Sequence, residues 1–349
     1  METEEEKKAN KENAEKVKKI VGELKDAFAT FHSLQDFYDQ VNVYAKEEKI
    51  NNLELAETNK SKFLIEDNRG GKNKIKLKLG STVFEVALGS VLKDKVVTKY
   101  TIERNDSDLR ISNDNKFEDL NKSGKKIFIR QIGYSLKDNV VTIATMPKNT
   151  VEVPKNLPLK IQSLRQAFYQ LNSSRINNIE KWNITNVSDI SEAFSYASEF
   201  NQDVSSWNTT NVRNMAGLFA DATKFNMPLN SWDVSNVRQM SNLFAGAAAF
   251  NQDLNSWNTE NVIDMESMFH TASSFNGNID NWNVKNVNTM SEMFAHTESF
   301  NKDLSKWKLN PIFNVVGMFT GNTKVDVEKL ASVWKISIDK FGRIDYNRK

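Results

Sequence analysis

A period of 25 residues runs through the second half of the chain and constrains its fold more than any other feature. One tryptophan column and two phenylalanine columns keep this period. A fixed period of about 20 to 50 residues indicates stacked repeats, because each unit can bury its apolar side only against its neighbours. The columns are Trp182, Trp207, Trp232, Trp257, Trp282 and Trp307; Phe194, Phe219, Phe244, Phe269, Phe294 and Phe319; and Phe200, Phe225, Phe250, Phe275 and Phe300.

Each unit combines two periodicities. From Val212 to Phe225 the apolar residues recur at steps of three and four, which predicts a short helix. Leu254, Trp257 and Thr259 end in alternation, which predicts a short strand. We therefore expect an α/β repeat: a right-handed, leucine-rich-repeat-like solenoid of about six 25-residue coils over residues 161–322. The strands would line its concave side and the helices its convex side.

Two asparagine columns share the period. One contains Asn201, Asn226, Asn251, Asn276 and Asn301, and the other Asn186, Asn211, Asn236, Asn261 and Asn286. We predict that these side chains lie at corners of the coil, where their amides pair with backbone groups and bridge to the neighbouring coil. A third column contains Asp203, Asp253 and Asp303, whose carboxylates could alternatively form a row of metal ligands. Pro228 and Asn278 occupy the same column and interrupt that row. We therefore predict no metal site.

The first 160 residues divide into three predicted segments. Residues 1–66 are a charged tail followed by an amphipathic helical segment, whose apolar stripe runs from Val17 to Val41. This stripe either packs on its own domain, the favoured interpretation, or allows self-association through residues 17–41 as a coiled coil. Residues 70–147 alternate in hydrophobicity and predict a small β-rich domain, and 148–160 predict a proline-containing linker into the repeats.

The remaining residues, 323–349, contain a segment from Val325 to Phe341 that predicts a helix and a strand. Because a stack of repeats ends in an exposed apolar layer, we expect this segment to cap it.

The composition limits the chemistry available to the chain. Its formal net charge of +2 gives no bulk electrostatic argument for a nucleic-acid partner, and the absence of cysteine excludes disulfides and thiolate sites. The chain has three histidines, His32, His270 and His296, and the last two lie at non-matching positions of the repeat, so they are expected as surface helix residues and not as ligands. We find no catalytic spacing and no phosphate-binding glycine loop. The sequence therefore predicts neither an enzyme nor a cofactor.

The binding hypothesis rests on side chains that alternate with the buried column residues. We expect them to point outward from the concave face, which would be polar and nearly neutral and would bind a host or extracellular protein or a glycan. The alternative is a solvated face on a structural stalk or shield that has no specific ligand. The candidate residues are Ser206, Asn208, Ser231, Asp233, Ser256, Asn258, Asn281, Asn283, Lys306 and Lys308.

The unit FNxDLSxWNTxNVxxMSxMFxxA resembles the repeat of BspA-like leucine-rich-repeat surface lipoproteins of mycoplasmas and their relatives. The resemblance covers residues 160 to 322, and the segment from Ile132 to Phe168 is similar to the one that often precedes such repeats. It implies a surface-exposed protein with a role in adhesion or host interaction, attached to the membrane by a lipid anchor. The chain shows no apolar signal segment and no lipobox cysteine, so membership implies that the export segment has been removed.

Overall fold

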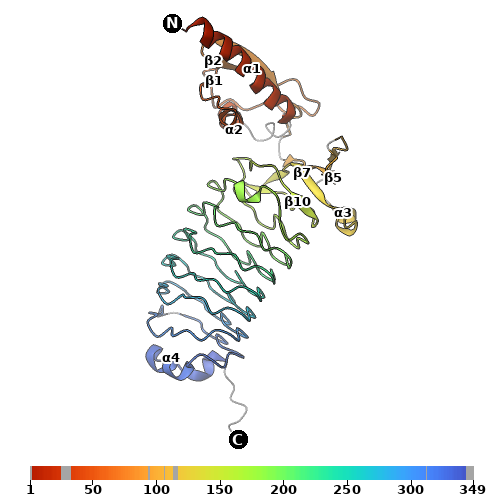
Figure 1. Cartoon of the computed structure of the whole chain (residues 1–349). Helices are drawn as coiled ribbons and strands as arrows, with labels where there is room; N and C mark the ends of the chain where they lie inside the picture. Colours follow the sequence, from red (N-terminus) through yellow and green to blue (C-terminus); the bar gives the residue numbers. More distant parts are fainter. Residues whose placement is uncertain are drawn as a thin grey trace.

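The computed structural model describes residues 2–24, 33–92, 95–105, 107–112, 117–311 and 313–342. A first domain, a group of strands, a long array and a terminal helix follow one another along the molecule (Figure 1). The elements are, in order, α1 (Glu4–Leu24), α2 (Leu34–Glu47), β1 (Leu53–Leu55), β2 (Lys74–Leu79), β3 (Thr82–Ala87), β4 (Lys95–Val96), β5 (Lys99–Ile102), β6 (Arg110–Ile111), α3 (Glu118–Lys122), β7 (Ile127–Gln131), β8 (Tyr134–Lys137), β9 (Val140–Ile143), β10 (Thr150–Glu152), the 3-10 turn η1 (Ile179–Lys181), α4 (Val327–Trp334) and the 3-10 turn η2 (Ile338–Phe341).

The first domain packs α1 and α2 against an antiparallel sheet of order β1-β2-β3. Strands β2 and β3 bury alternate side chains, because successive residues of a strand face opposite sides of the sheet. Val17 of α1 and Phe37 of α2 complete the same core. A capping box fixes the start of α2: the Ser33 hydroxyl accepts the N–H of Asp36, and the Asp36 carboxylate accepts the N–H of Ser33.

The predicted stripe from Val17 to Val41 is divided between two helices. Helix α1 ends at Leu24 and extended Ser33 caps a new one, while the intervening stripe residues Ala27, Phe28 and Phe31 lie outside the described residues. Val17 and Val41 are fully buried in the core of their own domain, so they are not available for a coiled-coil seam. The predicted charged tail is also wrong, because α1 begins at Glu4 and continues through it.

The structure moves the predicted domain boundary from residues 66–70 to the interval between Leu88 and Val96. The hairpin β2–β3 belongs to the first domain, because β1 pairs with β2 and α1 packs on β3. The strands from β4 to β10 instead share one continuous core with the repeats, in which Ile129 lies in the same cluster as Trp182. These strands are the N-terminal end of the array and do not form a separate β-rich domain.

Two sheets, of order β10-β7-β5-β6 and β4-β8-β9, lead into the repeats. Glu152 of β10 and Thr142 of β9 each form a parallel bridge with a repeat residue, Asn177 and Ser163 respectively. The predicted linker 148–160 is therefore wrong, because it contains β10 and the fully packed Val153 and forms a first partial layer of the stack.

The first domain is joined to this layer by polar contacts. The N–H of Leu159 donates to Gln40 Oε1 at 2.7 Å, and Lys160 lies 3.0 Å from the Asp36 carboxylate. A second ion pair joins Lys155 to Glu47 at 3.0 Å.

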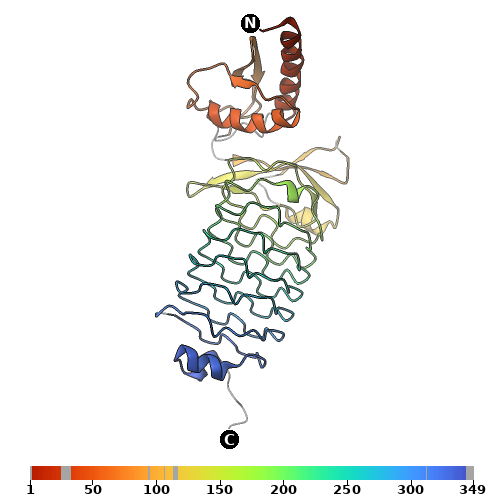
Figure 2. The ribbon, with the colours of Figure 1, turned by 60° about the vertical axis from the view of Figure 1, so that its left-hand side comes forward.

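The repeats form coils stacked side by side along the length of the molecule (Figures 1 and 2). Single-residue parallel bridges link each coil to the next through Ser163, Asp189, Asn214, Gln239, Asp264, Thr289 and Asn314. Backbone hydrogen bonds beside this ladder also run between coils, so each unit is completed only by its neighbour. The handedness of the stack and its relation to leucine-rich repeats stay predictions.

The predicted helix of each coil is wrong. Between Val153 and Asp326, the described residues contain no helix other than the 3-10 turn η1. In its place lie consecutive turns: the N–H groups of His270 and Ala272 donate three residues back, while those of Ser267, Phe269 and Thr271 donate to the next coil at 2.8–2.9 Å.

Left-handed backbone at two positions per coil explains this outcome. Ser267 and Thr271 have φ values of 54° and 55°, and the equivalent positions in the other coils are also left-handed. A right-handed helix cannot contain such residues. Because the left-handed positions recur four residues apart, the turns bury side chains at steps of three and four, and the resulting apolar pattern resembles that of a helix.

The aromatic columns form the core of the array. Within the first phenylalanine column, from Phe194 to Phe319, successive rings lie 5.6–5.9 Å apart at interplanar angles of 5–12°. Each indole N–H in the tryptophan column donates to a carbonyl of the preceding layer; for Trp257 the acceptor is Leu229, at 2.9 Å. The column therefore satisfies its buried polar atoms across coils.

Both asparagine columns bridge coils, as predicted. Asn261 Nδ2 donates to the carbonyl of Ser235 at 2.7 Å, and Asn226 Oδ1 accepts the N–H of Asn251 at 2.9 Å. Equivalent bonds repeat along each column. The amides thus replace backbone pairing at the corners of the coil.

Helix α4 and turn η2 close the far end of the array. The carbonyls of Lys340 and Phe341 accept the N–H groups of Gly317 and Phe319, and the rings of Phe319 and Phe341 lie 5.4 Å apart. The helix of the predicted cap is present, but the predicted strand is the 3-10 turn η2.

Candidate functional site: a polar face and its terminal pocket

The ten predicted face residues form two parallel columns on the surface of the array, here called the polar face. Nine of them are exposed, and Asn283 is half-buried. The alternation that motivated the prediction is present: Ser256 and Asn258 point outward, while Trp257 and Thr259 are buried. The strand predicted from this alternation is absent from the described residues, because this part of each coil consists of turns. The face is therefore an exposed row of turns, supported underneath by the tryptophan column.

Several of these polar side chains make hydrogen bonds that stabilise the fold. Asn208 and Asn258 accept the N–H two residues onward, both at 3.1 Å, and Asp233 accepts that of Ser235 at 2.9 Å. These are Asx turns, in which one side-chain oxygen stabilises the local backbone. The amide NH₂ groups of the asparagines have no such role and face solvent.

The charge of the face changes along its length. Asp233 is the one acidic member, and hydrogen bonds from Ser235 hold the pKa of its carboxyl below the usual range. Lys306 and Lys308 supply positive charge at the far end. Between these groups the face offers neutral hydroxyl and amide groups, which suit a ligand held by hydrogen bonds.

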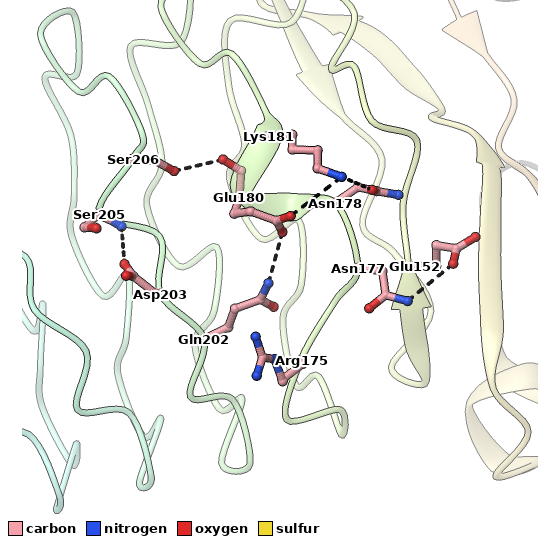
Figure 3. A pocket seen from close by; sticks show the side chains of 10 residues that line it. All are labelled: Glu152, Arg175, Asn177, Asn178, Glu180, Lys181, Gln202, Asp203, Ser205 and Ser206. Atoms are coloured by element: carbon pink, nitrogen blue, oxygen red, sulfur yellow. Dashed lines mark hydrogen bonds and ion pairs between the residues drawn. The ribbon is translucent and has the colours of Figure 1, made fainter.

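A pocket of about 680 Å³ opens at the N-terminal end of the polar face. We call it the head pocket; its walls come from three successive layers of the stack (Figure 3). The lining residues are Glu152; Arg175, Asn177, Asn178, Glu180 and Lys181; and Gln202, Asp203, Ser205 and Ser206. Ser206 belongs to both the pocket and the face, so the two surfaces are continuous.

Hydrogen bonds between layers fix the floor of the head pocket. Gln202 is almost fully buried; its Oε1 accepts the N–H of Ile176 at 2.8 Å, and its Nε2 donates to Glu180 Oε2 at 3.2 Å. The Ser206 hydroxyl donates to the carbonyl of Glu180 at 2.8 Å. Asp203 Oδ1 accepts the N–H of Ser205 at 2.8 Å (Figure 3). The backbone beneath the pocket is thus held in one arrangement.

Arg175 differs from the other charged residues of the pocket. Glu152 pairs with Arg130 at 2.7 Å, and Lys181 donates to Asn178 at 2.9 Å. Arg175 is exposed and makes no hydrogen bond or ion pair within the described residues. Its guanidinium therefore presents five N–H donors to the pocket.

The sequence interpretation placed Ser206 correctly on the surface but missed the head pocket around it. One signal was available: Arg175 stands 25 residues before Phe200, where the second phenylalanine column would continue. A charged residue in a buried aromatic column marks the point where the column ends and the surface opens.

The other candidates carry no site. His270 and His296 pack edge to face with ring centres 6.0 Å apart, on the turn side of the coils. Asp253 and Asp303, from the metal series considered above, bind the N–H of Asn278 and the Lys329 ammonium instead. Within the described residues no three His, Asp or Glu side chains gather around a point that could hold a metal ion.

In the described part of the chain, no helix has the length and apolar character to cross a bilayer.

Comparison with known proteins identifies the array but not its function. No curated protein and no solved structure matches the chain. Residues 162–272 and 253–338 match a family described as "Mycoplasma protein of unknown function, DUF285". The two matches overlap and together span 162–338, just over half of the chain, including the repeats and the helix that caps them. The chain therefore belongs to this mycoplasma repeat family of unknown function.

Proposed function

We propose that this protein is a non-catalytic interaction protein of the cell surface, and that its polar face binds a host or extracellular protein or a glycan. The observation that carries the proposal is the continuous surface from the head pocket along the polar face, with exposed hydrogen-bonding groups in every coil. Such a repeated surface suits extended partners. The resemblance to BspA-like surface lipoproteins supports the location and the lipid anchor.

The rigidity of the backbone supports binding over a purely solvated surface. Asx turns and inter-coil bonds hold the exposed groups in place before any partner arrives. A preorganised surface loses less conformational entropy on binding than a flexible one.

The test is a charge change that the fold tolerates. Asn208, Asn258 and Asn283 are replaced together by aspartate. Asp233 already occupies the same column and makes the same Asx bond, so these substitutions keep the turn. The full chain and the variant are compared for binding to arrays of extracellular matrix proteins and glycans. We expect the wild type to bind one of them and the variant to lose at least about 10-fold in affinity, the effect of about 1.4 kcal/mol.

A matched control places three negative charges elsewhere on the array. Ser198, Asn242 and Ser274 are exposed residues away from the polar face, and their replacement by aspartate should leave binding unchanged. Equal binding by wild type and face variant would refute the choice of site. A wild-type chain that binds no array member would favour the alternative of a structural stalk or shield.

Surface location is tested separately, by brief protease treatment of intact cells that make the protein. Loss of the repeat domain from intact cells is expected, whereas protection until lysis would contradict the proposal.

A further inference from the structure

The head pocket exists because one coil breaks the repeat. Arg175 occupies the position that phenylalanine fills in later coils, and Phe200 is the first ring of that column. One layer earlier, Glu152 forms a parallel bridge with Asn177, which stands 25 residues before Gln202. Polar side chains thus end a buried aromatic column at the surface, and the space beside them is the pocket.

The pocket has both donors and acceptors free for a ligand. Arg175 is unpaired within the described residues, as shown above. Asp203, which also lines the pocket, uses Oδ1 for the N–H of Ser205, so its Oδ2 is available to a ligand. Glu180 has one oxygen engaged by Gln202, and its other oxygen lies 4.0 Å from the Lys181 ammonium. A ligand in the pocket therefore meets a cationic donor and an anionic acceptor.

The charge balance selects the class of ligand. Three carboxylates and two cations line the pocket, and Glu152 is also paired with Arg130 and Arg104. The pocket is thus close to neutral and lacks the cluster of cations that phosphate or sulfate requires. It also has no aromatic lining on which a nucleobase would stack. Hydroxyl groups donate and accept at once, so they match paired donors and acceptors better than any single-sign ligand does.

We propose that the head pocket binds a neutral polyhydroxylated ligand, a hexose unit of a glycan, with Arg175 and Asp203 as the two groups that hold its hydroxyls. The volume of about 680 Å³ is of the size usual for small-ligand pockets. Because Ser206 belongs to both surfaces, a longer glycan continues from the pocket onto the polar face. This inference rests on the proposed function and specifies a glycan, one of the two ligand classes given there.

The experiment measures binding of free sugars to the full chain by saturation-transfer NMR and calorimetry. The probes are D-glucose, D-galactose, D-mannose and N-acetylglucosamine, with D-glucuronic acid and inorganic phosphate as charged counterparts. We expect at least one neutral sugar to bind, and the charged probes to bind more weakly or not at all. Binding of phosphate or glucuronic acid in preference to every neutral sugar, or of no probe, overturns the proposal.

Two variants assign the site. Arg175→Gln and Asp203→Asn should each weaken sugar binding about 10-fold or more, the scale of one hydrogen bond to a charged group. Asn278 stands in the column of Asp203, so asparagine is tolerated there. Arg213→Gln, at an exposed arginine outside the pocket, is the control and should leave binding unchanged. Unaltered binding in both pocket variants, with denaturation curves matching wild type, also overturns the proposal.

The outcomes separate this inference from the proposed function. If the full chain captures an extracellular partner through the polar face while no sugar enters the pocket, the inference fails and the function stands. If a sugar binds at Arg175 and Asp203 but the face variant retains every partner, the pocket stands and the extended face does not.

Discussion

Replacing Trp257 with phenylalanine tests whether the tryptophan column holds the coils together through its hydrogen bonds. The side chain is 2% exposed, its ring stacks on Trp282 at 6.1 Å, and its Nε1 donates to the Leu229 carbonyl at 2.9 Å. Phenylalanine keeps a stacked ring and removes the donor. The Leu229 carbonyl still accepts the N–H of Trp232 at 3.0 Å, so the lost bond costs about 0.5–1.5 kcal/mol. The smaller ring adds about 1–2 kcal/mol.

Trp334 provides the matched control. It packs beside Phe341 at 6.0 Å, but its Nε1 has no acceptor in the described structure. Trp334→Phe therefore loses ring area without losing a hydrogen bond, and it removes a buried unsatisfied donor. We expect it to cost about 0–1 kcal/mol, against about 1.5–3.5 kcal/mol for Trp257→Phe. Trp257→Ala should cost about 3–5 kcal/mol, and Trp334→Ala less.

The assay is urea denaturation of the full chain followed by circular dichroism, with the slope of the transition checked in each variant. A changed slope would mean that single coils unfold separately. The two variants would then be compared by amide hydrogen exchange in the coil that carries each substitution. Equal losses for Trp257→Phe and Trp334→Phe would refute the hydrogen-bonded column.

Other perturbations probe the turn segment and the far end of the array. Thr271→Gly should stabilise the protein by about 0.5–1 kcal/mol in denaturation, because it relieves a β-branched residue at φ 55°. Gly246→Ala should destabilise it by about 1–3 kcal/mol, since an added Cβ would lie 2.2 Å from Asp221 Oδ1; unchanged midpoints would contradict both. The hydrogen bond with Lys329 lowers the pKa of Asp303 to about 2, so the stability it contributes is complete above about pH 4 and disappears as the pH falls toward 2. Asp303→Asn should flatten the stability profile across that window, and an unaltered profile would show that this pair makes no contribution.

The sequence was sufficient to predict which residues are buried in the repeats, and insufficient to predict the backbone that buries them. Phe269 and Trp257 lie in stacked columns because a strict period leaves no other way to bury them. The helix assigned from steps of three and four was wrong, since Ser267 and Thr271 adopt left-handed conformations that their residue types do not suggest. Glycine would have indicated a left-handed position, but only some coils have it at these positions, as at Gly246. The 25-residue period alone did not reveal this signal.

The site was predicted in part for a similar reason. Ser206 and Asn258 are exposed because alternation with the buried column determines which side chains face outward. The head pocket depends on Glu152 meeting Asn177 across 25 residues, which required knowledge that the segment before the repeats forms a layer of the same stack. The boundary near residues 66–70 failed because β1, only three residues long, gives almost no signal by itself.

The row of parallel bridges from Ser163 to Asn314 sets the same spacing between each coil and the next. Each added coil consumes 25 residues and lengthens the molecule by one hydrogen-bonded layer, about 4.8 Å. The distance between the first domain and α4 can therefore change only in whole steps, and duplication of one unit would move the two ends apart without altering the interface at either. Reach is thus encoded by copy number, independently of the residues that any coil presents to its surroundings.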